Sequence, residues 1–485
     1  MLQLAKWMIG AAGLAALMTI AGCTVGPRYR APAPPTVTAY TPQPLPAETA
    51  SSVGTNGNAQ RFNEQAAIPA DWWTAFQSTE LNAMVEQALK NSPTLEQATA
   101  RLKQAQEEVM ARTGATKYPT VSGDASVTEE QLNLAAFGIP FPNPSPFTLL
   151  NGSVAVSYAL DVWGANRRAI EGLKAQRDYE AWQREGARLM MAGNVVAAAI
   201  RQAQIRQQIE ITNKLLAVEQ KELRIAEARE QVGGVSDFDV RSQRTLVAQT
   251  EAAISPLELQ LDIIDDQLAV LMGLSPAEAH VAEISLGALH LPGEMPLTVP
   301  SELVRHRPDI RAAEALLHEA SANVGVATAN EFPQIVLTGS GGGTGTRFNS
   351  GGDVWNVGAS LGAPIFNGGA LQAEKRKAQA AYDEAASAYR GTVLESFREV
   401  ADALYATVRD AETLKARSAA ASDAEGAYEI AAKRYEAGGI SEASLLDAER
   451  QQLQTALDRE NAAASRLTDS ATLYEALGGK AASSS

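Results

Sequence analysis

The residue types that most often carry catalysis are few and scattered in this chain. Its four histidines, at positions 280, 290, 306 and 318, have no metal-ligand spacing. The glycine-rich run at residues 339–345 lacks the Gly-Lys-Ser/Thr ending of a phosphate-binding loop, and we interpret it as a loop flanking a strand. No Ser/His/Asp or Cys/His arrangement is present. The sequence therefore predicts a protein that is not an enzyme and binds no metal and no dissociable cofactor.

The thiol of Cys23, the single cysteine, stands in an informative context. Lys6 and an apolar run over residues 7–20 precede it, which is typical of a secretory signal peptide. The ending Ile20-Ala21-Gly22-Cys23 resembles a bacterial lipobox. We expect diacylglycerol and an N-acyl chain such as palmitate on Cys23, because several acyl chains anchor a protein stably. An incidental cysteine, or an N-terminal membrane anchor, is the alternative.

One short turn occurs twice. Residues 229–240 read Arg-Glu-Gln-Val-Gly-Gly-Val-Ser-Asp-Phe-Asp-Val, and residues 434–445 read Arg-Tyr-Glu-Ala-Gly-Gly-Ile-Ser-Glu-Ala-Ser-Leu. The Gly-Gly pair can end one helix and the serine can cap the next. Each turn is therefore predicted to be the tip of a helical hairpin. Gly273 and Gly478 follow the two turns at the same separation, which indicates an internal duplication.

The elements that would position these turns are long helices and short strands. The first hairpin is predicted over 165–232 and 237–272, where Pro256 should kink or interrupt the return arm. Its first arm would be about 100 Å long. The second hairpin opens after 364–369 and ends with an arm over 441–477. In each repeat, shorter helices precede the strands. They are predicted over 81–90 and 94–112 in the first repeat, and the second repeat begins with a helical start at 300–310. Alternating polarity predicts strands over 121–128, 153–161, 334–340 and 354–361.

Prolines and glycines interrupt the helix and strand patterns, and these breaks suggest the domain organisation. In order, the expected segments are a signal peptide (1–22), a Pro-rich tether (23–60), a first repeat (61–273), a connector (274–299), a second repeat (300–478) and a loose tail (479–485).

Four strands in one chain constrain the architecture. They cannot close a barrel alone, and open sheet edges are not tolerated in lipid. The most apolar later segment, residues 189–200, is shorter than the ~20 residues of a membrane-spanning helix. Several chains would therefore have to share one barrel. The alternative is a lipid-tethered coiled-coil scaffold without a pore. A formal net charge of −15 argues against a nucleic-acid partner.

Several stretches resemble a known family. They read Cys-Thr-Val-Gly-Pro-Arg-Tyr at 23–29, Asp-Trp-Trp-Thr-Ala-Phe at 71–76, Pro-Ser-Glu-Leu-Val-Arg-His-Arg-Pro-Asp-Ile at 300–310 and Ala-Pro-Ile-Phe-Asn-Gly-Gly at 363–369. Together with both turns, they make the chain similar to the outer-membrane factors (TolC/OprM-like ducts), in their NodT-like lipoprotein branch. The resemblance covers essentially the whole mature chain.

The resemblance implies a mainly α fold with a β-barrel contribution, built from two tandem repeats, each with a helix, two strands and a long hairpin. A homotrimer would form a twelve-stranded outer-membrane barrel and a helical tunnel in the periplasm. Its partners would be a periplasmic adaptor (a membrane fusion protein) and an inner-membrane pump of the RND type. The complex would export drugs or other small toxic compounds. A type I protein-secretion duct is the alternative within the family.

The resemblance also implies site residues at the tips. Asp447, Asp239 and Tyr435 would line or lock the periplasmic mouth, while Ser444 stands where some members have a second aspartate. Symmetry-related carboxylates at a narrow mouth can lock it by hydrogen bonds and exclude anions. Alternatively, both aspartates only favour helix N-termini. The expected adaptor contacts are Gly233, Gly234, Val235, Gly438, Gly439 and Ile440.

Overall fold

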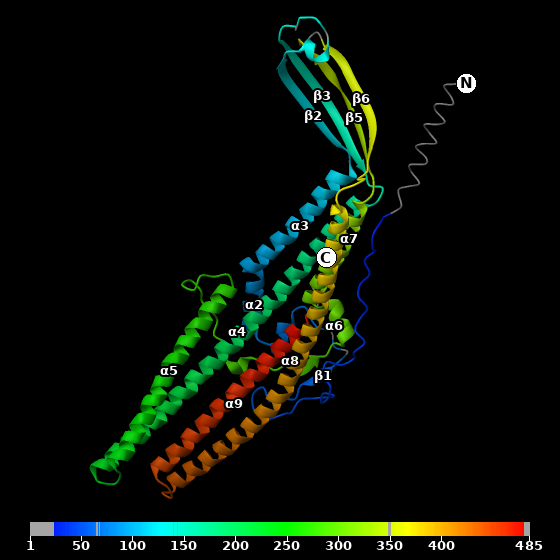
Figure 1. Ribbon diagram of the computed structural model, residues 1–485. Helices are drawn as coiled ribbons and strands as arrows, with labels where there is room; N and C mark the ends of the chain where they lie inside the picture. The colour runs from blue at the N-terminus through cyan, green and yellow to red at the C-terminus, as the bar shows by residue number, and fades with distance from the viewer. Residues whose placement is uncertain are drawn as a thin grey trace. The chain divides into compact units, whose positions relative to one another are not determined.

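A computed structural model describes residues 24–64, 66, 68–138, 140–142, 144–347 and 351–479 (Figure 1). The predicted signal peptide, Cys23 and residues 480–485 lie outside the described residues. The chain divides into two compact units. The first contains the chain up to Pro32, Arg101–Glu180 and Ala313–Tyr389, and we call it the sheet unit. The second contains Ala33–Ala100, Ala181–Ala312 and the chain from Arg390 onward, and we call it the hairpin unit.

The same order of elements occurs twice along the chain. The first set is α2 (Thr79–Asn91), α3 (Pro93–Lys117), β2 (Thr120–Glu130), β3 (Phe147–Leu160), α4 (Ala165–Gln231) and α5 (Asp237–Leu271). The second is α6 (Pro300–His306), α7 (Pro308–Ala329), β5 (Gln334–Gly345), β6 (Gly351–Gly362), α8 (Ala370–Glu436) and α9 (Glu442–Ala476). Helices α4 and α8 both have 67 residues, and α5 and α9 both have 35. The matched lengths are those expected of a duplicated hairpin.

Smaller elements complete the fold. They are β1 (Arg61–Asn63), β4 (Glu294–Pro296) and the 3-10 helices η1 (Trp72–Phe76), η2 (Leu134–Phe137) and η3 (Leu286–Ala288). Strands β1 and β4 pair in parallel, with Phe62 opposite Met295. This pairing joins the residues just before the first set of repeated elements to the connector before the second set.

The sheet unit contains one antiparallel sheet in the order β2-β3-β5-β6 (Figure 1). Its register aligns Val121, Val156, Gly339 and Val357 in one row across the four strands. The rows on this face are mainly apolar, whereas the neighbouring rows on the other face carry mainly Ser, Thr, Asp and Asn. Among the described strands, β2 and β6 each have one edge without a partner. The sheet is thus amphipathic and open on both sides.

The glycine run at residues 339–345 lies inside strand β5, so our interpretation of it as a loop was wrong. The reason is close contact between backbones. A Cβ on Gly342 would lie 2.2 Å from the carbonyl oxygen of Gly152 on β3. A side chain at this position would force the strands apart, so glycine is retained despite its low intrinsic preference for strands.

Pro256 does not interrupt α5, which continues from Asp237 to Leu271. The predicted interruption is therefore wrong. Proline removes one helical hydrogen bond and crowds the preceding turn. Pro256 is exposed, so water can satisfy the carbonyl group that loses its partner.

The main core of the hairpin unit forms where η1 and α2 pack on one face of the long helices. Trp72 stacks on Tyr474 of α9 with ring centroids 5.5 Å apart. The same cluster includes buried Val195 and Val196 of α4 and Leu404 of α8. Small residues allow α4 and α9 to contribute side chains to one continuous core. The Asp-Trp-Trp stretch thus packs apolar side chains against the long helices.

The predicted tether is extended, but part of it is held tightly. Arg466 of α9 is fully buried, and its guanidinium donates to the carbonyl oxygens of Asn56 (3.0 Å) and Asn58 (2.9 Å). It also donates to the hydroxyl of Thr49 at 2.8 Å. Gln60, likewise buried, donates to Ser470 Oγ at 2.9 Å. The segment from 49 to 60 is therefore a strap fastened to α9.

Replacing Arg466 with methionine should loosen this strap. The substitution leaves buried carbonyl oxygens without a donor, at a cost of about 3 kcal/mol. We expect faster tryptic cleavage at Arg61 and a lower unfolding temperature. Arg417→Met is the control, because Arg417 forms an exposed ion pair with Asp458 and such pairs contribute little. Equal protease resistance in both variants would contradict the role of Arg466.

Asp469 on the same helix should make stability depend on pH. Burial, followed by the neighbouring Asp410 carboxylate of α8, raises the pKa of Asp469 to about 8, and Arg466 opposes the shift. The folded state therefore binds a proton more tightly than the unfolded chain. Stability from this group is complete below pH 3.8 and declines as the pH rises toward 8.

Asp469→Asn should remove this loss, because an amide stays neutral. The expected result is a higher unfolding temperature than wild type at pH 9 and a smaller difference between pH 5 and pH 9. Differential scanning calorimetry would measure both. Asp458→Asn, an exposed site on α9, is the control. An unchanged pH profile in Asp469→Asn would show that this carboxyl group does not titrate in the folded protein.

Candidate functional site

Both hairpin tips end their first helix in the same way. The amide of Gly234 donates to the carbonyl oxygen of Arg229 at 2.7 Å, and that of Gly233 to Glu230 at 2.9 Å. At the second tip, Gly439 donates to Arg434 at 2.7 Å and Gly438 to Tyr435 at 2.9 Å. These are the paired bonds of a Schellman motif, in which the first glycine takes positive φ. Gly233 and Gly438 both have φ of +71°, so the turns are duplicated in conformation as well as in sequence.

The serines after the glycines cap the next helices, but with different partners. Ser236 Oγ accepts from the amide of Asp239, and the Asp239 carboxylate accepts from the amide (3.0 Å) and hydroxyl (2.7 Å) of Ser236. This is a complete capping box. At the second tip Ser444 takes the equivalent position, with its hydroxyl 3.0 Å from that of Ser441. The hydrogen bonds from Ser236 hold the pKa of exposed Asp239 below its usual range.

Asp447 lies one turn further along α9 and has a different partner. Its Oδ1 accepts from Arg450 Nη2 at 2.5 Å, and its side chain is 69% exposed. Sequence reasoning missed Arg450, although a spacing of three on a helix indicates such a pair. The pair leaves most of the Asp447 carboxylate open to solvent, which suits a group that contacts another chain or an ion.

Arg450 also influences two carboxyl groups on α4. Burial raises the pKa of Glu219, while a hydrogen bond with Thr250 and the charge of Arg450 oppose the shift. Burial likewise raises the pKa of Glu222, which accepts a hydrogen bond from Gln243 of α5 at 2.6 Å. The second tip is therefore coupled electrostatically to the first hairpin. Lys221 adds an ion pair with Glu442 at the start of α9, at 3.0 Å.

The turn residues expected to contact an adaptor differ in their exposure to solvent. All four turn glycines are exposed, whereas Val235 and Ile440 are half-buried; Tyr435 is 39% exposed. The first tip also exposes Val232 (82%) and Phe238 (76%), which sequence reasoning missed. The equivalent positions of the second tip are alanines. The two tips thus share a backbone but offer different apolar surfaces.

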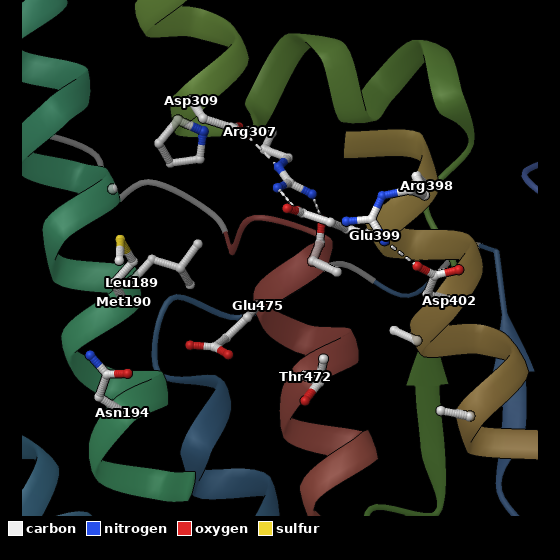
Figure 2. Close-up of a pocket in the computed structure, with 15 residues that line it drawn as sticks. Leu189, Met190, Asn194, Arg307, Asp309, Arg398, Glu399, Asp402, Thr472 and Glu475 are labelled. Carbon is white, nitrogen blue, oxygen red and sulfur yellow. Dashed lines mark hydrogen bonds and ion pairs between the residues drawn. The ribbon is translucent and has the colours of Figure 1, made fainter. Parts of the chain in front are cut away.

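Arg307, at the junction of α6 and α7, forms ion pairs. Arg307 pairs with Asp309 at 2.9 Å and with Glu399 of α8, and donates to the carbonyl oxygen of Ala476 at 2.6 Å (Figure 2). Burial opposes its charge, but these carboxylates outweigh burial and raise the pKa of Arg307 above its usual range. The junction thereby fastens the end of α9 to α8.

Within the described residues, no helix combines the length and the apolar composition needed to cross a membrane. In the same part of the chain, no three His, Cys, Asp or Glu side chains converge in a way that could hold a metal ion.

Known proteins share this architecture. A family model described as "Outer membrane efflux protein" matches residues 84–274 and 299–479, one segment in each repeat. The pyoverdine export outer membrane protein OpmQ of Pseudomonas putida is 32% identical over 456 residues, covering 92% of this chain and 94% of that protein. Nodulation protein T of Rhizobium leguminosarum bv. trifolii is 27% identical, covering 89% of each chain.

The fold agrees with these sequence matches. The solved outer-membrane channel OprN superposes with a TM-score of 0.81 at 26% identity, covering 94% of this chain and 99% of that one. The resemblance to outer-membrane factors, including the tandem repeat and its location in the outer membrane, is therefore confirmed. This chain belongs to the outer membrane efflux protein family.

Proposed function

We propose that three copies of this chain form the outer-membrane duct of a tripartite efflux pump, which passes small molecules from the periplasm to the outside. The observation that carries the proposal is the open, amphipathic sheet of an outer-membrane efflux family member. Its apolar face suits lipid and its polar face suits a water-filled lumen. Its unpaired edges on β2 and β6 can be satisfied when copies pair edge to edge.

The duct needs an energy source and a connection to it. A periplasmic adaptor and an RND-type inner-membrane pump would supply both. The exposed glycines of the two tips, together with Val232 and Phe238 of the first, offer a surface on which an adaptor could dock. We assign the duct no catalytic step.

A lipid on Cys23 fits the part of the chain that follows it. The amide of Val25 donates to the carbonyl oxygen of Trp163 at 3.1 Å, at the junction of β3 and α4. A Cβ on neighbouring Gly164 would lie 2.4 Å from the Thr24 side chain. Both contacts fix Thr24 and Val25 at the end of the sheet. Acyl chains on Cys23 would therefore enter the leaflet beside the strands.

The gate is proposed at the second tip. The pair formed by Asp447 and Arg450 is exposed, whereas Asp239 is engaged in its capping box. In a trimer, three such pairs around a narrow mouth could exchange partners between neighbouring chains and hold the mouth closed. Tyr435 and Ser444, on the same tip, are proposed to line this mouth, with Asp239 stabilising the first tip.

Removing Asp447 should open the duct. Asp447→Ala frees Arg450 from its partner and removes three carboxylates from the mouth of a trimer. In planar bilayers we expect mean conductance to increase at least severalfold, with fewer closures, because the proposed lock is lost. Asp458→Ala is the matched control, since it removes an exposed carboxylate from the same helix at a site distant in sequence from the tip.

Other results would change the proposal in defined ways. Pores that are identical in wild type and Asp447→Ala would keep the duct but move its gate elsewhere. Folded trimeric protein that forms no pores at all would contradict the duct and favour a scaffold.

The role of Cys23 can be separated from that of the sheet. In Cys23→Ala, cleaved by an ordinary signal peptidase after a leader exchange, lipid cannot be attached. We expect the variant to remain in the outer-membrane fraction after carbonate washing, because the strands hold it there, although assembly should be slower. Release of folded protein into the soluble fraction would mean that acyl chains alone anchor it, which would overturn the duct.

A further inference from the structure

A hollow of about 690 Å³ opens in the hairpin unit between α4, α8 and the end of α9 (Figure 2). Its size is within the range of small-molecule sites. Leu189 and Met190 line it from α4, and Ala403 and Ala406 line it from α8. An apolar molecule of drug size would therefore find both space and contact surface.

The hollow borders the core of the hairpin unit on one side and is open on the other. On α4, Met191 and Val195 are buried in that core, whereas Met190, which lines the hollow, is 65% exposed. On α9, Leu473 is in the core and Thr472 lines the hollow. One wall of the hollow is therefore part of the core, because Ala403 of α8 belongs to both, whereas exposed Met190 and Thr472 lie at its open side. In the proposed duct, the open side of the hollow is the one that can border the lumen.

The positive charges around the hollow are already neutralised. Arg307 is paired with Asp309 and Glu399, and Arg398 with Glu395 and Asp402. A ligand anion would therefore have to displace a protein carboxylate from a formed pair. Each arginine faces two carboxylates, so these pairs are net negative and the hollow disfavours anions.

Glu475 adds a further carboxylate, one that is not paired with an arginine. Its carboxylate extends from α9 toward α4 (Figure 2), where a Cβ on Gly193 would lie 1.2 Å from Glu475 Oε1. The absence of a side chain at Gly193 makes room for the carboxylate. Among the described residues, Glu475 has no hydrogen-bond donor and no ion-pair partner, although it is mostly buried by neighbouring helices. A partly desolvated carboxylate without a counter-charge is unfavourable, and a bound cation would relieve it.

We propose that this hollow binds organic cations with an apolar body, with Glu475 as their counter-charge. The inference rests on the proposed duct function and specifies its substrate class. The cation would lie against Glu475 while its apolar groups contact Met190, Leu189 and Ala406. Passing molecules would pause here, since a single weak charge contact in water-filled surroundings favours binding without trapping.

The charged neighbours of Glu475 determine how binding depends on pH. Glu399 and Asp402 of α8 and Asp309 of the junction are acidic, while Arg398 and Arg307 pair with them; α4 contributes Gly193 and neutral Asn194. Burial, and then Glu399, raise the pKa of Glu475 to about 7. The carboxylate is mainly neutral at pH 6 and mainly charged at pH 8, so cation binding strengthens as the pH rises.

The test uses tetraphenylphosphonium, a permanent cation, and tetraphenylborate, an anion of nearly the same shape. Equilibrium dialysis against the full-length protein in lipid nanodiscs measures binding of both. We expect the wild type to bind the cation roughly tenfold more tightly at pH 8 than at pH 6, following ionisation of Glu475, and to bind the anion far more weakly at both.

Two variants separate the effect of the Glu475 charge from the effect of the space in the hollow. Glu475→Gln should weaken cation binding about tenfold at pH 8 and remove the pH dependence. Ala406→Trp should also weaken it, by filling the hollow while Glu475 remains. Glu425→Gln is the control of equal net charge, because Glu425 is exposed on α8 and does not line the hollow. It should bind like the wild type.

Several outcomes would overturn the proposal. Equal binding in wild type and Glu475→Gln, or equal binding of cation and anion, would exclude Glu475 as a counter-charge. No binding in nanodiscs that conduct normally would mean that the hollow is filled in the assembled duct, and would leave the duct intact. No conductance from the same folded preparation would instead defeat the proposed function.

Discussion

The fold of the hairpin unit depends on close packing of long helices through small side chains. Alanines are buried where α4, α8 and α9 meet, including Ala199, Ala403, Ala464 and Ala471. Small residues let backbones approach, so that helices can lie side by side over many turns without a bulky core between them. A wall of this kind has two faces. One of them is covered by η1 and α2, and the hollow beside Glu475 opens at the edge of the core, where the helices are not covered.

A layer of helices packed through small residues needs other stabilising interactions where large apolar contacts are absent. Two buried guanidinium groups provide them at separate places. Arg307 links the repeat junction to α8 and to the last carbonyl of α9, while Arg466 binds the backbone of the strap. A guanidinium suits both roles because it offers five donors in a fixed plane. Each arginine holds together segments that are distant in sequence. Apolar packing between alanines would join such segments less selectively.

The sequence was a good guide to the hairpins because their signals are local. Runs without breakers, the Gly-Gly turns and the capping serines predicted α4 over 165–232 and α5 over 237–272, within one residue of the observed ends. The predictions failed where the conformation of a residue depends on the tertiary structure and not on its neighbours in sequence. The strand glycine Gly342 is explained by a neighbour on β3, and the continuous helix at Pro256 by exposure to solvent. Proline and glycine were interpreted from propensity alone, which tertiary context overrode.

The same distinction applies to the candidate site. Asp239, Tyr435, Ser444 and Asp447 could be placed on the tips from the turn alignment, but their partners could not. Arg450 was within reach of a spacing argument, whereas Glu475 and Arg466 were not. Their importance comes from Gly193 and from the strap, which lie far away in sequence. No local pattern distinguishes a glutamate that faces an open hollow from one on an ordinary solvated helix.

The duplicated tips help to separate structural carboxylates from functional ones. Position N3 of the cap is Asp239 in the first tip and Ser444 in the second, and both helices are capped by the serine three residues before. Capping therefore tolerates either residue, so an acidic group is not required there. Asp447 lies beyond the cap, and its equivalent in the first repeat is Ser242. Since helix formation explains the carboxylate of Asp239 but not that of Asp447, the proposed gate is better assigned to the second tip.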